Sequence, residues 1–103
     1  TVFQPHLYSR TRLFSQEFAE VLMLSDEVVV TEIYAAREDP EPGVTAELIT
    51  AKAQRQENTH LVPKWDDVPA AAAALASSGD FIITMGCGDI NRMVPELLAA
   101  LER

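Results

Sequence analysis

The feature that most constrains the fold is a fourfold alternation of short apolar runs with segments of helical periodicity. Two of the runs, 27–33 and 81–85, are rich in β-branched residues and nearly continuous, which is typical of strands covered on both faces of a parallel sheet. The other two, 1–5 and 59–62, end at or just before a proline. We predict a Rossmann-like α/β fold: a mainly parallel sheet with helices on both faces, built from a strand–helix unit repeated four times.

Helices are predicted in the segments that follow the four runs. The first, over about residues 11–24, presents one apolar stripe at helical spacing. The members of this stripe are Phe14, Phe18, Val21 and Leu22. The other helices are expected over 46–54 with Thr45 as cap, over 68–76 with Asp66 or Asp67 as cap, and from residue 94 onward after a single turn at 90–93.

The composition limits the classes of function open to the chain. Its 103 residues suffice for one domain with a modest core, so we predict a single domain over 1–103. A formal net charge of −8 argues against nucleic acid and against an anionic membrane surface as partners, since both need basic surfaces. The single cysteine, Cys87, allows no internal disulfide and is compatible with a reducing cytoplasm. No segment resembles a signal peptide or reaches the length of a membrane span.

The chain opens directly on a strand pattern at Thr1–Phe3, without a methionine or a lead-in segment. An isolated domain rarely begins on a core strand in this way. We therefore expect the sequence to be a piece of a longer protein, with the first strand or helix of the domain lying upstream of Thr1.

The first twelve residues form a basic island on an acidic chain, because they include Arg10 and Arg12 and no carboxylate. The island lies where a strand gives way to a helix, which is the place where open α/β sheets hold ligands. Arg10 would bind an anion through its planar donor fork, with His6 as a tunable donor or acceptor. Ser9 or Thr11 would cap the helix and leave further amide groups free for the anion. In the alternative interpretation, the arginines are solvated at the helix start and His6 bonds to a loop carbonyl.

A second candidate is the turn Gly86–Asp89, which follows the last predicted strand. Gly86 and Gly88 would let the backbone approach a ligand closely. The turn lacks the third glycine of a dinucleotide fingerprint, and Asp89 places a carboxylate where a phosphate would lie. The alternative is a steric turn with Asp89 as helix cap. We interpret Cys87 as a small residue of this turn rather than a nucleophile, because Asp89 opposes a thiolate.

The acidic loop 34–43 leaves the carboxyl end of another predicted strand and is therefore expected on the same rim as the basic island. Glu38 in this loop would meet Arg10 or another domain, whereas Asp39 and Glu41 are expected to be solvated. No cluster of side chains along the sequence has the spacing of metal ligands, and the phosphate-binding pattern G-x-x-x-x-G-K-[ST] is absent.

Three stretches together resemble one family. Residues 3–11, Phe-Gln-Pro-His-Leu-Tyr-Ser-Arg-Thr, resemble the F-Q-P-H-x-Y-[ST]-R-T segment of the bacterial UDP-N-acetylmuramate–L-alanine ligases, one branch of the Mur ligases. Residues 34–40, with Gly43, are similar to the Y-x-A-x-E-x-P loop of this family, and residues 85–90 look like its G-A-G-D-[IV] turn. The resemblance runs over nearly the whole chain with the same order of elements, and the first motif is specific to this branch.

The resemblance implies the C-terminal domain of a three-domain, cytoplasmic enzyme of peptidoglycan synthesis. In this family the first domain holds the UDP-sugar, and the central domain carries the phosphate-binding loop and binds most of ATP and Mg²⁺. The C-terminal domain closes over both and helps to hold L-alanine and the nucleotide. The carboxylate of UDP-N-acetylmuramate is activated with ATP as an acyl phosphate, which the amine of L-alanine then attacks. A fragment limited to the C-terminal domain is expected to contain no catalytic residue and to be inactive alone.

Residue by residue, the resemblance implies that His6 and Arg10 face L-alanine, with Arg10 binding its carboxylate. It also assigns four residues to the same substrate cleft and two to its rim or to contacts with other domains. These are Tyr8, Gly86, Gly88 and Asp89 in the cleft, and Glu38 and Arg12 at the rim. Leu7 departs from the family, since many relatives have an arginine there. The alternative function is a stand-alone α/β module that binds a small anion without catalysis.

Overall fold

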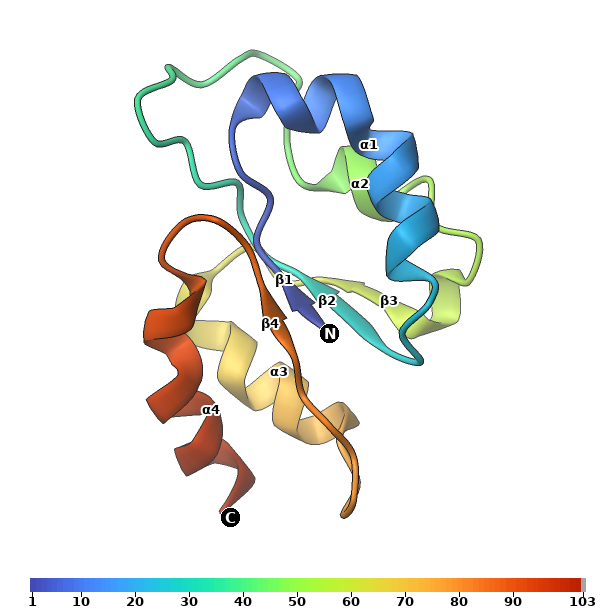
Figure 1. Ribbon diagram of the computed structural model, residues 1–103, viewed down its shortest axis with the longest axis vertical. Coiled ribbons are helices and arrows are strands. Elements are labelled where there is room, and N and C mark those ends of the chain that lie inside the picture. The colour runs from blue at the N-terminus through green and yellow to red at the C-terminus, as the bar shows by residue number, and fades with distance from the viewer. Residues whose placement is uncertain (103) are drawn as a thin grey trace.

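Residues 1–102 are described by the computed structural model in Figure 1. Strands and α-helices alternate along them as β1 (Val2–Phe3), α1 (Tyr8–Leu22), β2 (Val28–Val30), α2 (Glu47–Thr50), β3 (Thr59–Leu61), α3 (Val68–Leu75), β4 (Thr84–Met85) and α4 (Val94–Leu101). Short 3-10 helices, η1 (Gln56–Asn58), η2 (Trp65–Asp67) and η3 (Ile90–Met93), precede β3, α3 and α4. The predicted alternation is confirmed, as is the turn before α4. Within these residues, every helix is too short or too polar to cross a bilayer.

The four strands form one parallel sheet in the order β3-β2-β1-β4. Val2 of β1 pairs with Val29 of β2 and with Thr84 of β4, so β1 is an inner strand. The chain therefore builds β2 and β3 on one side of β1 and then returns to place β4 on the other. This arrangement confirms the predicted Rossmann-like α/β class. It also creates a switch point between the carboxyl ends of β1 and β4, where sheets of this kind hold ligands.

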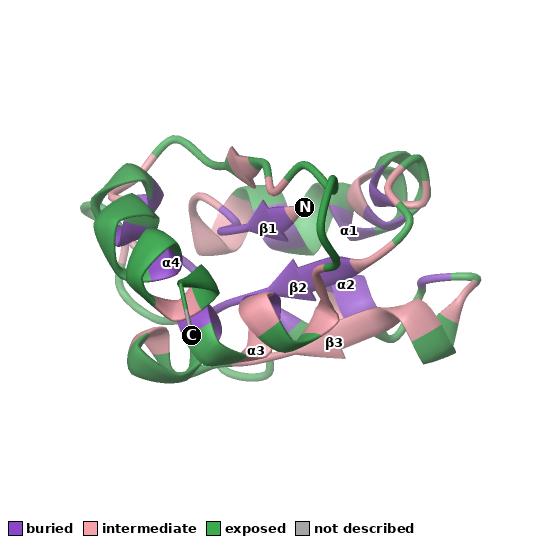
Figure 2. Cartoon of the chain, turned by 90° about the horizontal axis from the view of Figure 1, so that it is seen from below, coloured by how far each residue is buried: buried purple, intermediate pink, exposed green. Residues whose placement is uncertain are grey.

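Helices cover both faces of the sheet, α1 and α2 on one face and α3 and α4 on the other (Figure 1). Val28 and Val30 belong to the core beneath α1 and α2, whereas Val29 between them belongs to the core beneath α3 and α4. Coverage of both faces explains why the predicted run 27–33, whose first half contains β2, is apolar at successive positions. Figure 2 accordingly shows β1 and β2 as buried and the edge strand β3 as intermediate.

The apolar run 81–85 forms a shorter and more exposed strand than predicted. Only Thr84–Met85 pair as β4, while Phe81 is 91% exposed and Ile83 is 55% exposed. The reason is topological: β4 lies at the edge of the sheet and has β1 as its single neighbour. Whether an edge run is buried depends on what covers the edge, and the residue types of the run do not specify this.

Helix α1 begins at Tyr8, earlier than predicted, and its buried face matches the predicted stripe only in part. Phe14 and Val21 are 48% and 58% exposed, whereas Phe18 is partly buried against Phe3 at a ring-centroid distance of 5.3 Å and Leu22 is buried. The buried positions of α1 are Thr11, Ser15, Ala19 and Leu22. These residues also recur at helical spacing, and most of them are small enough for the helix to pack closely against its neighbours. The prediction is therefore confirmed for Phe18 and Leu22 and wrong for Phe14 and Val21.

At one of the predicted helix starts a hydroxyl accepts a helix N–H, although Ala46, which directly precedes α2, makes no side-chain capping bond. The Oγ1 atom of Thr45 accepts the N–H of Glu47, the first residue of α2, at 3.3 Å. Neither Ser9 nor Thr11 caps α1, and the aspartates at 66–67 make no capping bond to α3. The start of α1 is stabilised instead by a residue that is distant in the sequence, as described next.

Candidate functional site

The loops after β1 and β2 are joined at the carboxyl end of the sheet. His6 and Tyr34 form an isolated parallel bridge beyond the two strands. The N–H of Tyr34 donates to the carbonyl oxygen of Pro5 at 2.8 Å, and the N–H of Leu7 donates to the carbonyl oxygen of Tyr34 at 2.9 Å. The basic island and the acidic loop therefore share one rim of the sheet, as their positions after strands predict.

Arg10 and His6 lie together at the start of α1. The Nη1 atom of Arg10 is 3.4 Å from the Nδ1 atom of His6, which precedes it by one helical turn. Arg10 is exposed, and no carboxylate within residues 1–102 lies at ion-pair distance from its guanidinium. The two side chains singled out as an anion site are therefore neighbours, and the guanidinium retains donors for a ligand.

The amino end of α1 is occupied by a carboxylate of the chain itself. Glu38 accepts the N–H of Ser9 at 3.1 Å through Oε1, and it accepts the hydroxyl of Ser9 through Oε2. The hydroxyl of Ser9 is the largest cause that lowers the pKa of Glu38, with smaller contributions from the N–H groups of Ser9 and Tyr8 and from nearby His6. Glu38 thus takes the place of the expected cap and does not pair with Arg10. An external anion would have to use side chains rather than these helix amides.

Arg12 forms an ion pair with Glu41, with 3.0 Å between Nε and Oε2. Glu41 is therefore not simply solvated, as the sequence led us to expect. Both side chains are partly exposed, so the pair lies at the surface and ties the acidic loop to α1. Of the two arginines of the basic island, Arg10 is the one left without an acidic partner.

Leu7 connects His6 to α1 in a backbone conformation that leucine rarely adopts, with φ at 70°. The carbonyl oxygen of Leu7 accepts the N–H of Thr11 at 3.2 Å and its hydroxyl at 2.9 Å. Thr11 itself is fully buried. Strain of this kind persists only where the surroundings hold it, and it concentrates at functional sites. The two bonds from buried Thr11 therefore hold Leu7, the residue that joins His6 to α1, in place.

The glycine turn after β4 is packed against the other two loops. A Cβ atom at Gly86 would lie 2.9 Å from the carbonyl oxygen of Gln4, and one at Gly88 would lie 2.5 Å from the Cγ atom of Tyr34. The Nε2 atom of Gln4 donates to the Oδ1 atom of Asp89 at 2.9 Å. Contacts within the domain thus require both glycines, in agreement with the steric interpretation. The carboxylate of Asp89 holds the turn and makes no capping bond to η3.

Among residues 1–102, Tyr8 and Cys87 make no hydrogen bond with Arg10 or His6. Tyr8 is partly buried and packs against the core beneath α1 and α2. Cys87 is exposed in the glycine turn. The structure therefore gives Tyr8 a packing contact, and a contact of Tyr8 with substrate stays a prediction.

Tyr34 is the member of the site that sequence reasoning missed. Its ring stacks on the ring of His6, with the centroids 5.8 Å apart and the planes at 15°. The same ring lies against the backbone of Gly88. The sequence did offer one indication of its role, namely its position. Tyr34 directly follows the run 27–33, and a residue at the carboxyl end of a predicted parallel strand lies next to the loop of the neighbouring strand.

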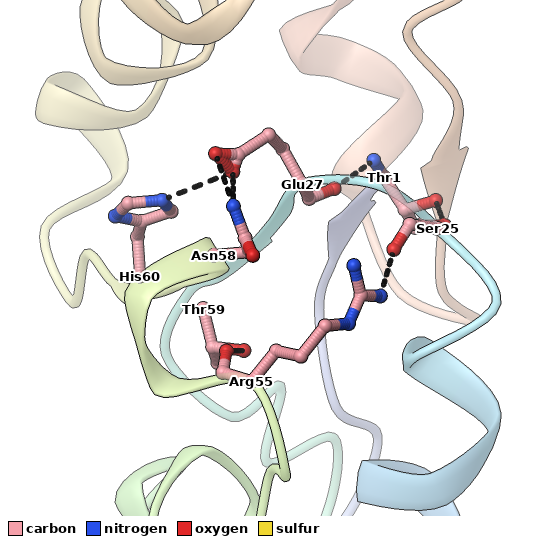
Figure 3. Close-up of polar contacts among 7 residues, drawn as sticks. All are labelled: Thr1, Ser25, Glu27, Arg55, Asn58, Thr59 and His60. Atoms are coloured by element: carbon pink, nitrogen blue, oxygen red, sulfur yellow. Dashed lines mark hydrogen bonds and ion pairs between the residues drawn. The ribbon is translucent and has the colours of Figure 1, made fainter.

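The amino ends of the strands carry a second polar cluster, shown in Figure 3. The carboxylate of Glu27 accepts two contacts from Nδ2 of Asn58, at 3.1 and 3.3 Å, and lies 3.5 Å from Nε2 of His60. Arg55 donates from Nη2 to two carbonyl oxygens at the end of α1, each at 2.6 Å. These contacts tie β2, β3 and α1 together, and the charges in this cluster are directed at partners within the chain.

Comparisons with known proteins now identify the family. The family described as "Mur ligase, glutamate ligase domain" matches residues 1–88. The chain belongs to the Mur ligase family. It is 51% identical over 100 residues to the UDP-N-acetylmuramate–L-alanine ligase of Thermobifida fusca (strain YX), and 50% identical over 103 residues to that of Saccharopolyspora erythraea. The protein of the same name from Rhodococcus jostii (strain RHA1) is 48% identical over 101 residues.

These alignments cover 97–99% of the chain but only 20–21% of each relative. The chain thus spans about a fifth of the length of the curated relatives that it matches. The resemblance carried by residues 3–11, 34–40 and 85–90 is confirmed at the level of the Mur ligase family.

The described residues of this Mur ligase domain offer no cluster of metal ligands and no open glycine loop for a phosphate group. No three His, Cys, Asp or Glu side chains among residues 1–102 lie together as metal ligands. The glycine turn contains the carboxylate of Asp89, which opposes a phosphate group, and contacts within the domain account for its glycines. What the arrangement offers is one exposed guanidinium beside an imidazole, which suits a small organic anion such as a carboxylate.

Proposed function

We propose that this Mur ligase domain is part of a cytoplasmic, ATP-dependent ligase that joins L-alanine to UDP-N-acetylmuramate in peptidoglycan synthesis. Support comes from relatives that bear the name of this ligase and are about half identical to nearly the whole chain. Within the enzyme, the domain closes the active site and helps to bind the amino acid.

The observation that carries the proposal is the unpaired guanidinium of Arg10 at the carboxyl end of the sheet. The chain as a whole has a formal net charge of −8, so an anionic substrate is attracted only where a cation is locally free. Arg12 is neutralised by Glu41, and Glu38 occupies the helix amides. Within the basic island, Arg10 is therefore the group that would bind the carboxylate of L-alanine, with His6 beside it at 3.4 Å.

A carboxylate held by Arg10 would fix one end of L-alanine and leave its amine free to attack an activated carboxyl group. Holding the two reactants in one orientation lowers the entropic part of the barrier, and closure of the domain excludes water that would compete with the amine. The domain contributes binding and orientation in this scheme. UDP-N-acetylmuramate, ATP and Mg²⁺ are assigned to the other domains of the longer enzyme.

The test is the variant Arg10→Ala in the full-length ligase. We expect the KM for L-alanine to rise roughly 10- to 100-fold, because a hydrogen bond to a charged group is worth about 1.5–3 kcal/mol. The KM for ATP should stay within about twofold of the wild-type value. The measurement is steady-state release of phosphate at varied L-alanine and varied ATP.

Two results would count against the proposal. A wild-type enzyme that releases no phosphate in response to L-alanine would exclude the ligase. An active wild type in which Arg10→Ala raises the KM for L-alanine and for ATP equally would exclude the carboxylate role of Arg10 alone.

The alternative is a stand-alone anion-binding module. Its discriminating feature is the coding sequence upstream of Thr1. A phosphate-binding pattern such as G-x-x-G-K-[ST] in that region supports the ligase, whereas a native start just before Thr1 supports the module.

A further inference from the structure

The residue that joins all parts of the candidate site is Tyr34, at the end of the segment that follows β2. Its backbone bonds both to Pro5 and to Leu7, which flank His6 in the loop after β1. Its side chain then contacts His6 on the one hand and the glycine turn on the other.

The ring of Tyr34 occupies the space that a side chain at position 88 would need. A Cβ atom added to Gly88 would come within 2.5 Å of Cγ and 2.8 Å of Cδ1 of this ring, which is closer than real Cβ contacts allow. Gly88 and Tyr34 are therefore complementary: the glycine admits the ring, and the ring packs on the glycine backbone. The hydrogen bond from Gln4 to Asp89 holds the turn that presents Gly88.

The other contact of the ring leads to the guanidinium. Tyr34 stacks on His6 with nearly parallel planes, and Nδ1 of His6 is 3.4 Å from Nη1 of Arg10. Arg10 is exposed and has a long side chain, so few other contacts restrict where its charge lies. A fixed imidazole beside the guanidinium restricts it, and the imidazole is itself held by the stack.

We propose that Tyr34 is a positioning residue that acts through His6 to hold Arg10 in the place where the carboxylate of the amino acid binds. This inference rests on the proposed function and deepens it, since it explains how a domain without catalytic groups achieves binding of a small substrate. It also explains why residue 88 is a glycine: the ring of Tyr34 fills the space that a side chain at this position would need.

The first experiment replaces Tyr34 in the full-length ligase. Tyr34→Leu removes the stack, and the KM for L-alanine should rise about 3- to 10-fold while kcat and the KM for ATP change less than about twofold. Tyr34→Phe is the matched control, because it keeps the ring and the hydroxyl makes no hydrogen bond with residues 1–102. The control should match the wild type.

A purely structural role of Tyr34 gives a different pattern. It would lower the unfolding midpoint and the active fraction, so kcat would fall without a selective change in the KM for L-alanine. That pattern, or an unchanged KM in a folded Tyr34→Leu enzyme, would overturn the inference while leaving the ligase function intact. A wild type that does not respond to L-alanine would remove the proposed function and this inference with it.

The second experiment uses the complementarity of the two residues. Gly88→Ala should raise the KM for L-alanine, because the new methyl group displaces the ring of Tyr34. In the double variant Gly88→Ala with Tyr34→Ala, the combined effect should be smaller than the product of the two single effects, since Tyr34→Ala removes the Cγ and Cδ1 atoms that overlap with the new methyl group. Strictly multiplicative effects would contradict the proposed coupling. If Gly88→Ala does not fold, the comparison of Tyr34→Leu with Tyr34→Phe decides.

Discussion

The two ends of the parallel sheet use charged side chains in opposite ways. At the amino end, Arg55 donates to the carbonyl oxygens of Met23 and Ser25. Glu27 accepts from Asn58 at the same end, as Figure 3 shows. At the carboxyl end, Arg10 is exposed and has no carboxylate partner among residues 1–102. The first end holds α1 against the sheet, and the second keeps a charge available.

The comparison indicates at which charged positions a substitution should leave the fold of the domain intact. A charge satisfied by the chain contributes to stability, and its removal leaves acceptors without a partner. A charge without a partner contributes little to stability and can be used for a ligand. Variants at the amino end should therefore alter the free energy of unfolding, and variants of the open charges at the carboxyl end should alter substrate binding.

The largest effect on stability among the polar groups is expected from Arg55→Ala. The variant leaves two carbonyl oxygens at the end of α1 without their donor, so the free energy of unfolding should fall by about 2 kcal/mol. Urea unfolding measures the change, and Arg92→Ala, at an exposed position, serves as the matched control with a change under about 0.5 kcal/mol. A rise in the KM for L-alanine in a folded Arg55→Ala enzyme would contradict the proposal that charges at the amino end serve stability and charges at the carboxyl end serve binding.

Glu38→Gln should produce an intermediate effect that depends on pH. The bonds from Ser9 lower the pKa of Glu38 below its ordinary value of 4.5, so the ionised form is favoured in the folded state. The stabilisation is fully present above about pH 4.5 and is lost as the pH falls through the lower folded-state pKa. The variant should therefore be less stable than the wild type at neutral pH, and the difference should shrink in acid.

The measurement is the free energy of unfolding of the wild type and of Glu38→Gln as a function of pH. Asp39→Asn is the matched control, because it removes a neighbouring exposed carboxylate for which the structure shows no hydrogen bond. A difference between Glu38→Gln and wild type that stays constant into acid would show that the carboxylate does not hold the start of α1.

The smallest effect is expected from Arg12→Gln. The ion pair with Glu41 joins side chains that are 51% and 36% exposed, so its loss should cost less than about 1 kcal/mol and matter less at high salt. The KM for L-alanine should stay at the wild-type value, in contrast to Arg10→Ala. An equal rise of this KM in both variants would show that the basic island acts through its total charge rather than through Arg10.

Much of the fold could be predicted because its causes are local. Because helices cover both faces of the sheet, every position of β2 carries an apolar residue, and Val28, Val29 and Val30 are all buried. The neighbouring positions of His6 and Arg10 follow from one helical turn between them. The predictions that proved wrong concern features that depend on distant parts of the chain. Phe81, for example, is exposed because nothing among residues 1–102 covers the edge of the sheet at β4.

The sequence by itself determined the class of sheet, the family motifs and the basic island after β1, since each is encoded in a contiguous stretch. Only the tertiary structure decided how the island is used. Glu38 reaches Ser9 across 29 residues and occupies the helix amides. Tyr34, after β2, meets Gly88, after β4, beyond the end of β1, which lies between these two strands. These partners are brought together by packing of the layers, which no local pattern of residues records.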